Sequence, residues 1–128
     1  MPLEPVRQPQ SLLTAVASGL RVHDQPGVQT LVSVEASLAA VPRLIVLDGA
    51  EYLREHVAEL TSRLLSAAPD VRFVVTSRVV LGVSGEVCWT VPPLHCPSAA
   101  AGALDIEASD AVQLFLARAR ERLPGFWQ

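Results

Sequence analysis

The stretch Leu44-Ile45-Val46-Leu47-Asp48 (LIVLD, residues 44–48) decides the fold of this chain. The apolar run is too short for a helix. A run of this kind that ends in a carboxylate is typical of a strand buried on both faces in a parallel sheet. We therefore predict a parallel strand over 44–48 with Asp48 at its carboxyl end.

The residues after Asp48 predict a strand–helix–strand unit. Apolar side chains between residues 50 and 67 recur at spacings of three and four with charged residues between them, which is typical of an amphipathic helix. Pro69 and Asp70 end this pattern, and the β-branched run over 71–76 predicts a second strand. Two strands joined in this way lie parallel and are connected by a right-handed crossover.

The flanking sequence predicts further elements of the same sheet and its helical layers. Upstream, apolar residues at helical spacing predict helices over 11–20 and 28–41, and three prolines in the first ten residues predict an irregular start. Downstream, residues 86–91 predict a third parallel strand that two prolines end. The predicted fold class is therefore α/β, with a three-layer core.

The C-terminal part of the chain predicts a change of domain. Residues 1–94 form the α/β core in this interpretation, and the small residues over 95–108 form a linker. Ser109 is placed to cap a helix over 109–122, which carries arginines near its C-terminal end where the helix dipole favours cations. We interpret residues 109–128 as the start of a following helical domain.

The composition excludes several classes of function. The net charge is -3, and the ten positive residues, all of them arginine, are scattered along the sequence, so we expect no direct contact with nucleic acid. The chain has no apolar run long enough to span a membrane and no signal peptide, and its two cysteines lack zinc spacing. We therefore expect a cytoplasmic protein with reduced thiols and no membrane partner.

Polar residues follow both strands of the predicted unit. Asp48 and Glu51 follow the first strand, while Thr76 and Arg78 end the second. Parallel strands end at one edge, so these side chains would meet where open α/β sheets bind ligands. The alternative is structural, because Asp-x-x-Glu before a helix is also a capping-box pattern and Arg78 could be an exposed loop arginine.

Three stretches of the chain resemble a known family. The stretches RLIVLDGAEYL (43–53), APDVRFVVTSRVVLGVSGEVCWTVPPL (68–94) and SDAVQLFLARARERLPGF (109–126) are similar to the ATPase module of large bacterial LuxR-type transcriptional regulators, a STAND (NB-ARC-like) branch of the ASCE-type P-loop NTPases. The upstream VHDQPG (22–27) fits as well. The resemblance implies that ATP and Mg²⁺ are the cofactors of the parent family.

The resemblance also assigns roles to residues at the sheet edge. It implies that Asp48 is the Walker B acid, which holds Mg²⁺ through its water shell. Glu51 becomes the candidate catalytic residue that positions the attacking water. Thr76 and Arg78 become nucleotide-binding residues, with Arg78 as the sensor that reports the γ-phosphate.

Departures from the family pattern argue against catalysis by this chain alone. The family usually follows its Walker B acid with Asn-Cys-Glu-His, whereas Gly49, Ala50, Glu51 and Tyr52 stand here. The chain has no GxxxxGK[ST] loop and no lysine to reach the β- and γ-phosphates. We therefore expect a partial P-loop core that is not a competent ATPase and holds neither ATP nor Mg²⁺ by itself.

The missing phosphate loop predicts a structural opening as well. In the family the strand that leads into this loop lies between the sensor strand, here 71–76, and the strand at 86–91. Its absence would leave open strand edges, which other polypeptides cover in stable proteins. Two interpretations follow: a truncated ATPase-domain fragment of a LuxR-type regulator, or an interaction module whose partner is the missing part of a split regulator.

Overall fold

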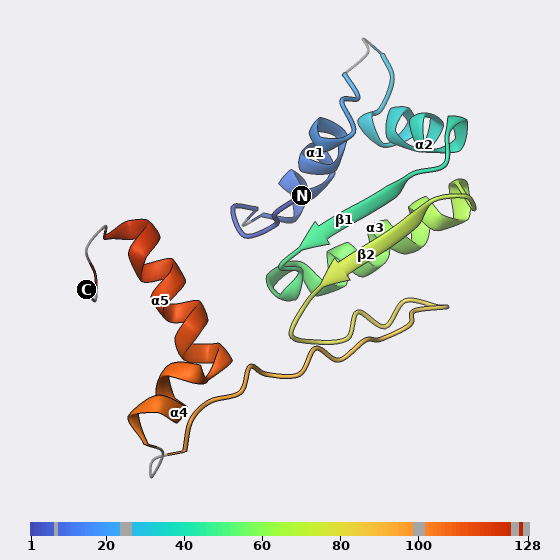
Figure 1. Cartoon of the computed structure of the whole chain (residues 1–128). Helices are drawn as coiled ribbons and strands as arrows, with labels where there is room; N and C mark the ends of the chain where they lie inside the picture. Colours follow the sequence, from blue (N-terminus) through green and yellow to red (C-terminus); the bar gives the residue numbers. More distant parts are fainter. Residues whose placement is uncertain (7, 24–26, 99–101, 124–125, 127–128) are drawn as a thin grey trace. The chain divides into compact units, whose positions relative to one another are not determined.

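The computed structural model describes residues 1–6, 8–23, 27–98, 102–123 and 126, and the chain divides into two compact units (Figure 1). The first unit is Met1–Cys88 and contains the sheet; the second is Trp89–Gln128 and is helical. No helix in the described part of the chain is long and apolar enough to cross a membrane.

The sheet of the first unit has two parallel strands, β1 (Leu44–Asp48) and β2 (Arg72–Thr76). Their register pairs Leu44 with Arg72 and Asp48 with Thr76. The connection between them contains the short 3-10 helix η1 (Glu51–Leu53) and the helix α3 (Arg54–Ala67). Both predicted strands of this unit are present, and the predicted helix over 50–67 is divided between η1 and α3.

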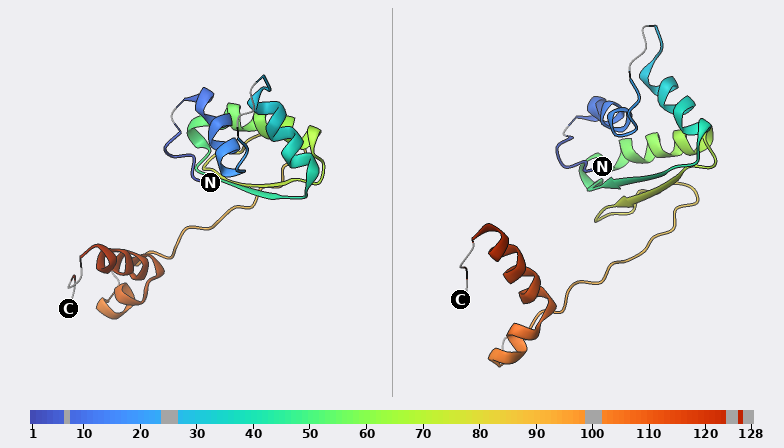
Figure 2. Two further views of the ribbon diagram at one scale, coloured as in Figure 1. Left: turned by 90° about the horizontal axis from the view of Figure 1, so that it is seen from above. Right: turned by 45° about the horizontal axis from the view of Figure 1, so that its top comes forward.

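Helices cover only one face of this sheet. The helices α1 (Pro9–Gly19) and α2 (Thr30–Ala40) lie with α3 on the same side of the strands, as Figure 2 shows. Burial along β1 alternates accordingly: Ile45 and Leu47 are 5% and 2% exposed, but Leu44 and Val46 are 65% and 43% exposed. The prediction of a strand buried on both faces within a three-layer core was therefore wrong, and the first unit has two layers.

The core lies between the three helices and the covered face of the sheet. It joins apolar residues from every element of this layer, and the largest fully buried side chains are Val16, Val34, Leu38, Leu47, Val57, Leu64 and Val71. Val34 and Leu38 of α2, and Val57 and Leu64 of α3, recur at helical spacing, so the amphipathic pattern of the sequence already identifies them.

The predicted third strand over 86–91 is absent. These residues belong to no strand, and the alternating side chains Val87, Trp89 and Val91 are 91%, 87% and 80% exposed. A strand needs a neighbour to satisfy its main-chain groups. In the described residues β2 pairs with β1 alone, and residues 86–91 do not pair with the free edge of β2.

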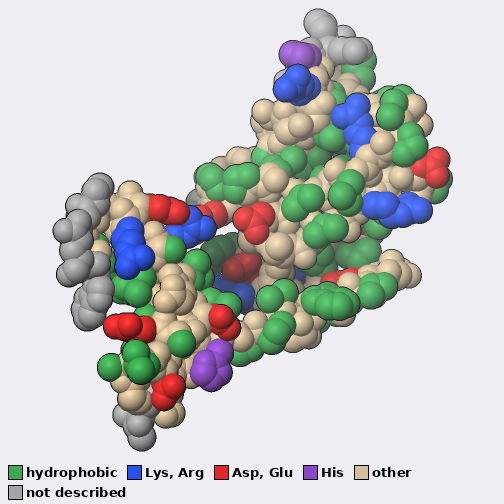
Figure 3. All heavy atoms as spheres, in the orientation of Figure 1, with side chains coloured by type: hydrophobic (Ala, Val, Ile, Leu, Met, Phe, Trp, Pro, Cys, Tyr) green, Lys and Arg blue, Asp and Glu red, His purple; other side chains and the backbone are tan. Residues whose placement is uncertain are grey.

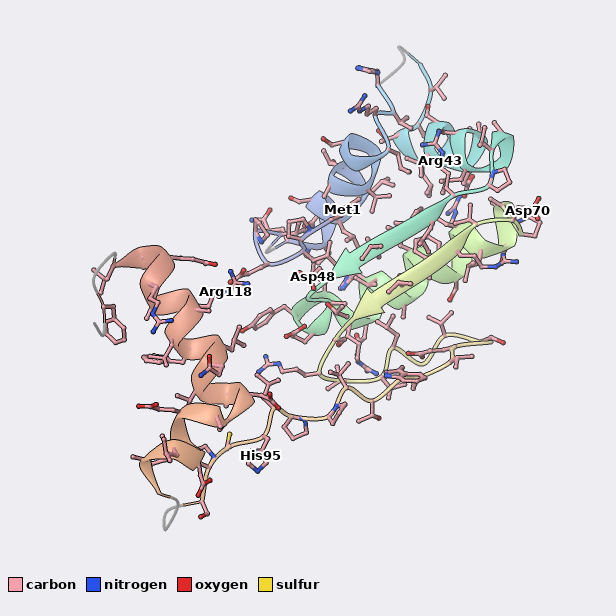
Figure 4. All side chains as sticks on the ribbon, viewed as in Figure 1. Met1, Arg43, Asp48, Asp70, His95 and Arg118 are labelled. Carbon is pink, nitrogen blue, oxygen red and sulfur yellow. The ribbon has the colours of Figure 1, made fainter. Side chains whose placement is uncertain are left out.

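The first residues of the chain form an unexpected addition to the sheet. The Leu3 N–H donates to Asp48 O at 2.7 Å, and the Asp48 N–H donates to Met1 O at 2.9 Å. Pro2 forms a parallel bridge with Asp48, and Leu3 is only 2% exposed. Residues 1–3, which the sequence predicted to be irregular, therefore cover the β1 edge that faces away from β2 (Figure 4).

The C-terminal end of α1 contains a residue in the left-handed conformation. Arg21 has φ 57°, the N–H of Val22 donates to Ala17 O at 2.9 Å, and the N–H of Arg21 donates to Ser18 O at 3.0 Å. These two bonds define a Schellman motif, in which this position is usually glycine. A non-glycine residue there costs roughly 1–2 kcal/mol.

The second unit contains α4 (Ala103–Ala108) and α5 (Asp110–Arg122). The helix α4 lies within the segment that the sequence predicted to be a linker. Ser109 occupies the N-cap position of α5, but its hydroxyl donates to the carbonyl of His95 at 3.0 Å and makes no cap. The rings of Phe115 and Phe126 pack edge to face, with their centroids 5.9 Å apart.

Candidate functional site

The carboxyl ends of β1 and β2 bring Asp48 and Thr76 into contact. The two residues are register partners, and the Thr76 hydroxyl donates to Asp48 Oδ1 at 2.5 Å. The same hydroxyl accepts the N–H of Gly49 at 2.9 Å. Figure 4 shows Asp48 at the tip of its strand. The predicted proximity of these two residues is present in the structure.

The other two predicted residues form a second pair at this edge. Arg78 Nε lies 3.0 Å from Glu51 Oε1, and the two side chains are 76% and 22% exposed. Ion pairs as open as this one contribute about 0–1 kcal/mol to stability. The family resemblance assigns the guanidinium of Arg78 to the γ-phosphate, but in the structure it is paired with the carboxylate of Glu51.

The turn after β1 determines where these carboxylates lie. Gly49 has φ 81°, and the N–H groups of Gly49 and Ala50 donate to Thr76 O at 3.2 and 3.0 Å. Neither η1 nor α3 has a side-chain cap. The capping-box alternative was therefore wrong. The turn bonds to the end of β2, and the carboxylates of Asp48 and Glu51 bond to Thr76 and Arg78 instead of capping a helix.

Glu51 retains one unsatisfied oxygen. Its Oε2 is buried and has no hydrogen-bond partner among the described residues. A buried acceptor without a donor costs roughly 1–3 kcal/mol, so this position favours a water molecule or another donor. A phosphate oxygen is itself an acceptor and would not satisfy it.

The residues at this edge do not fit a magnesium–triphosphate group. Phosphate sites need N–H groups or cations, whereas this edge presents two carboxylates and a guanidinium that one of them already binds. Magnesium in nucleotide sites is held by one or two carboxylates together with the substrate phosphates. The two carboxylates at this edge are instead bonded to Thr76 and Arg78. No cluster of three or more His, Cys, Asp or Glu among the described residues is arranged to hold a metal.

The loop after β2 contains a carboxylate site that the sequence did not indicate. Glu86 accepts the N–H groups of Leu81, Gly82 and Val83 at 3.1, 2.7 and 3.2 Å. Desolvation opposes ionisation of Glu86, but these donors outweigh it and hold its pKa below the usual value. The pKa of the Cys88 thiol is raised, first by desolvation and then by the negative charge of Glu86.

The Glu86 pKa has a defined consequence for stability. Because it is lower in the folded chain than the ordinary value of 4.5, the three hydrogen bonds stabilise the loop above that pH. This contribution disappears as the pH falls through the lowered folded pKa. At neutral pH the loop over 81–86 is therefore stabilised by hydrogen bonds from its main-chain N–H groups to the ionised Glu86.

Comparison with known proteins adds a relationship in sequence. No protein-family model matches the chain, and no solved structure matches it. A "Putative HTH-type transcriptional regulator" of Mycobacterium tuberculosis (strain ATCC 25618 / H37Rv) is 32% identical over 124 residues, which are 97% of this chain and 13% of the relative. A regulator with the same description from Mycobacterium bovis matches equally well.

A second group of relatives is shorter. An "Uncharacterized protein" of Mycobacterium tuberculosis H37Rv is 33% identical over 110 residues, which are 86% of this chain and 24% of that protein. The chain thus spans about 13% of the length of the regulators that it matches. Its sequence is related to one segment of proteins described as HTH-type transcriptional regulators.

Proposed function

We propose that this chain is a non-catalytic segment of the ATPase region of a LuxR-type transcriptional regulator. One observation carries the proposal: the side chains expected to serve the nucleotide are bonded to one another. Thr76 donates to Asp48, and Arg78 pairs with Glu51. In this view the four side chains join the tips of β1 and β2, and ATP is used only in the complete parent regulator.

The charge balance of this edge supports the proposal. A triphosphate would meet the carboxylates of Asp48 and Glu51, with Arg78 as the nearby cation. Nucleotide sites of this class depend on a glycine-rich loop of N–H groups and a lysine, and all ten positive residues of this chain are arginine. A regulator of this kind acts in the cytoplasm, and its DNA contacts lie in another segment.

A hydrolysis assay tests the absence of catalysis. We expect no Mg²⁺-dependent release of phosphate from ATP above the background of buffer alone, because the chain has no lysine and Arg78, the cation at this edge, is paired with Glu51. The matched variant Glu51→Gln removes the candidate catalytic carboxylate and should give the same background rate. Turnover by the original chain that disappears in Glu51→Gln would contradict the proposal.

The open side of the sheet supports a second function, that of an interaction module. The main-chain N–H of Arg72 and the carbonyl of Thr76 form hydrogen bonds on the β1 side of β2. Because successive residues of a strand direct their main-chain groups to opposite sides, those of Phe73 and Val75 point away from β1, toward the free edge of β2. The uncovered face carries Leu44, Val46 and Val74, of which Val74 is 49% exposed. Figure 3 shows hydrophobic side chains gathered over these strands. We propose that the missing part of a split regulator supplies a strand here.

Self-association tests this second function, because a further copy can also supply a strand to an open edge. We expect the purified chain to associate in a concentration series measured by sedimentation velocity. Val74→Lys should abolish association without unfolding the chain, since its side chain is already half exposed. Leu104→Lys, at an exposed position of α4, is the control. A strictly monomeric chain, or equal association of both variants, would contradict this function.

A further inference from the structure

We propose that a groove between the C-terminal end of α1 and the helix α2 binds a small phosphorylated ligand. The groove consists of two hollows of about 340 and 550 Å³ that share Arg21, Val22 and His23 in their walls. None of the residues in these walls belongs to the sheet edge that carries Asp48 and Glu51. The groove is therefore a separate candidate site.

The groups in the walls of the groove suit an oxyanion. Thr14 and Ser18 of α1 line the smaller hollow, and Ser33 and Ser37 of α2 line the larger one, so each wall includes residues with hydroxyl groups. No aspartate or glutamate is among the described residues of either wall. A guanidinium and several hydroxyl-bearing residues, with no carboxylate among the described residues of the walls, are the kinds of donor that a phosphate group requires.

Within the described residues Arg21 is one of several arginines whose guanidinium has no partner, and it is the one that lines both hollows. Arg54, Arg63, Arg78 and Arg118 each form an ion pair with a glutamate. Within the described residues the guanidinium of Arg21 has neither an ion pair nor a hydrogen bond. It is thus available to an external anion.

A second unpartnered group lies in the same wall. The Oγ of Ser33 is buried and has no hydrogen-bond partner among the described residues. Buried hydroxyls in proteins are nearly always bonded, and in helices they commonly donate to a carbonyl one turn earlier. Because Ser33 lines the larger hollow, rotation of its side chain would allow the hydroxyl to donate to an oxyanion there and would satisfy this polar group.

The backbone at Arg21 is the third observation. The residue holds φ 57° at a position of the Schellman motif where glycine is the ordinary choice. Strained backbone positions concentrate at functional sites, where a particular side chain is retained despite its conformational cost. Here the side chain at the strained position is the guanidinium in the wall of both hollows.

The apolar part of the groove limits the class of ligand. Val22 borders both hollows, and Val28 and Val32 line the larger one. A group that fills this space would place its phosphate against Arg21 and Ser33 and a small carbon skeleton against the valines. The chemistry favours a small phosphomonoester over a bare inorganic ion, and inorganic phosphate is the simplest probe of the anion-binding part.

Calorimetric titration of the full chain with inorganic phosphate tests the proposal. We expect a Kd of about 1 mM, with Arg21→Gly and Ser33→Ala each weakening binding at least about tenfold. Both variants should melt at the same temperature as the original chain or higher, because one removes backbone strain and the other removes an unsatisfied hydroxyl. Arg63→Gln, which removes an arginine outside the groove, should bind phosphate normally.

The alternative outcomes are distinct from one another. Equal binding by the original chain and Arg21→Gly, or equal heats with phosphate and chloride, would show an adventitious ion only and overturn the proposal. No binding by the folded original chain would also overturn it. A loss of binding accompanied by a lower melting temperature in both variants would assign Arg21 and Ser33 to the fold.

Discussion

Leu47→Ala is expected to lower the free energy of unfolding by about 3 kcal/mol, whereas Leu44→Ala should lower it by less than about 1 kcal/mol. Both residues lie on β1, but Leu47 is 2% exposed and Leu44 is 65% exposed. Removal of the Leu47 side chain leaves a cavity between the sheet and the helices. Removal of the Leu44 side chain leaves no cavity, because most of that side chain already contacts water. Urea unfolding followed by circular dichroism measures both values.

The two leucines form a matched pair because the residue type, strand and substitution are identical. Comparable losses of stability in the two variants would mean that the open face of the sheet is covered in solution. That outcome would restore the three-layer arrangement that the sequence predicted, and it would contradict the two-layer fold described above.

Leu3→Ala is the second change with a large expected effect, a loss of about 2–3 kcal/mol of stability. Leu3 is 2% exposed and belongs to the segment that bonds to the free edge of β1. Faster hydrogen exchange of the Asp48 amide, which donates to Met1 O, should accompany the loss. Glu4→Ala alters an exposed neighbour and should change stability by less than about 0.5 kcal/mol. Equal effects of the two variants would show that residues 1–3 do not add to the sheet.

The sequence predicted the elements whose patterns are local and strong. The amphipathic spacing over 50–67, the apolar run over 44–48 and the β-branched run over 71–76 correspond to α3, β1 and β2. Asp48, Thr76, Glu51 and Arg78 could be placed at one edge because the ends of parallel strands meet there. The choice of partners, Asp48 with Thr76 and Glu51 with Arg78, depends on the turn at Gly49 and could not be predicted.

The remaining errors have a common physical origin in missing neighbours. The apolar residues Leu44 and Val46 suggested burial on both faces, yet burial requires a second layer that the described chain does not place there. The alternation over 86–91 is a property of the segment itself, but a strand also requires a pairing partner. Local sequence contains no information on whether such a neighbour is present.

Two features were missed for a different reason. The bridge made by Pro2 is too short to show a periodic pattern, and proline argues against a strand. The left-handed conformation of Arg21 is set by the Schellman motif, whose usual sequence signal is glycine. The apolar Val22 after it, which packs against the core, is the signal that could have been used.

We propose that the side chains of Asp48, Glu51, Thr76 and Arg78 bond to one another and that this edge binds no nucleotide in this chain. Isothermal titration calorimetry with ATP and Mg²⁺, on a sample that circular dichroism shows to be folded, tests it most directly. We expect no binding heat from the original chain and none from Asp48→Ala. A Kd of about 1–10 μM that is lost in Asp48→Ala would contradict it, because the edge would then bind nucleotide without a phosphate loop.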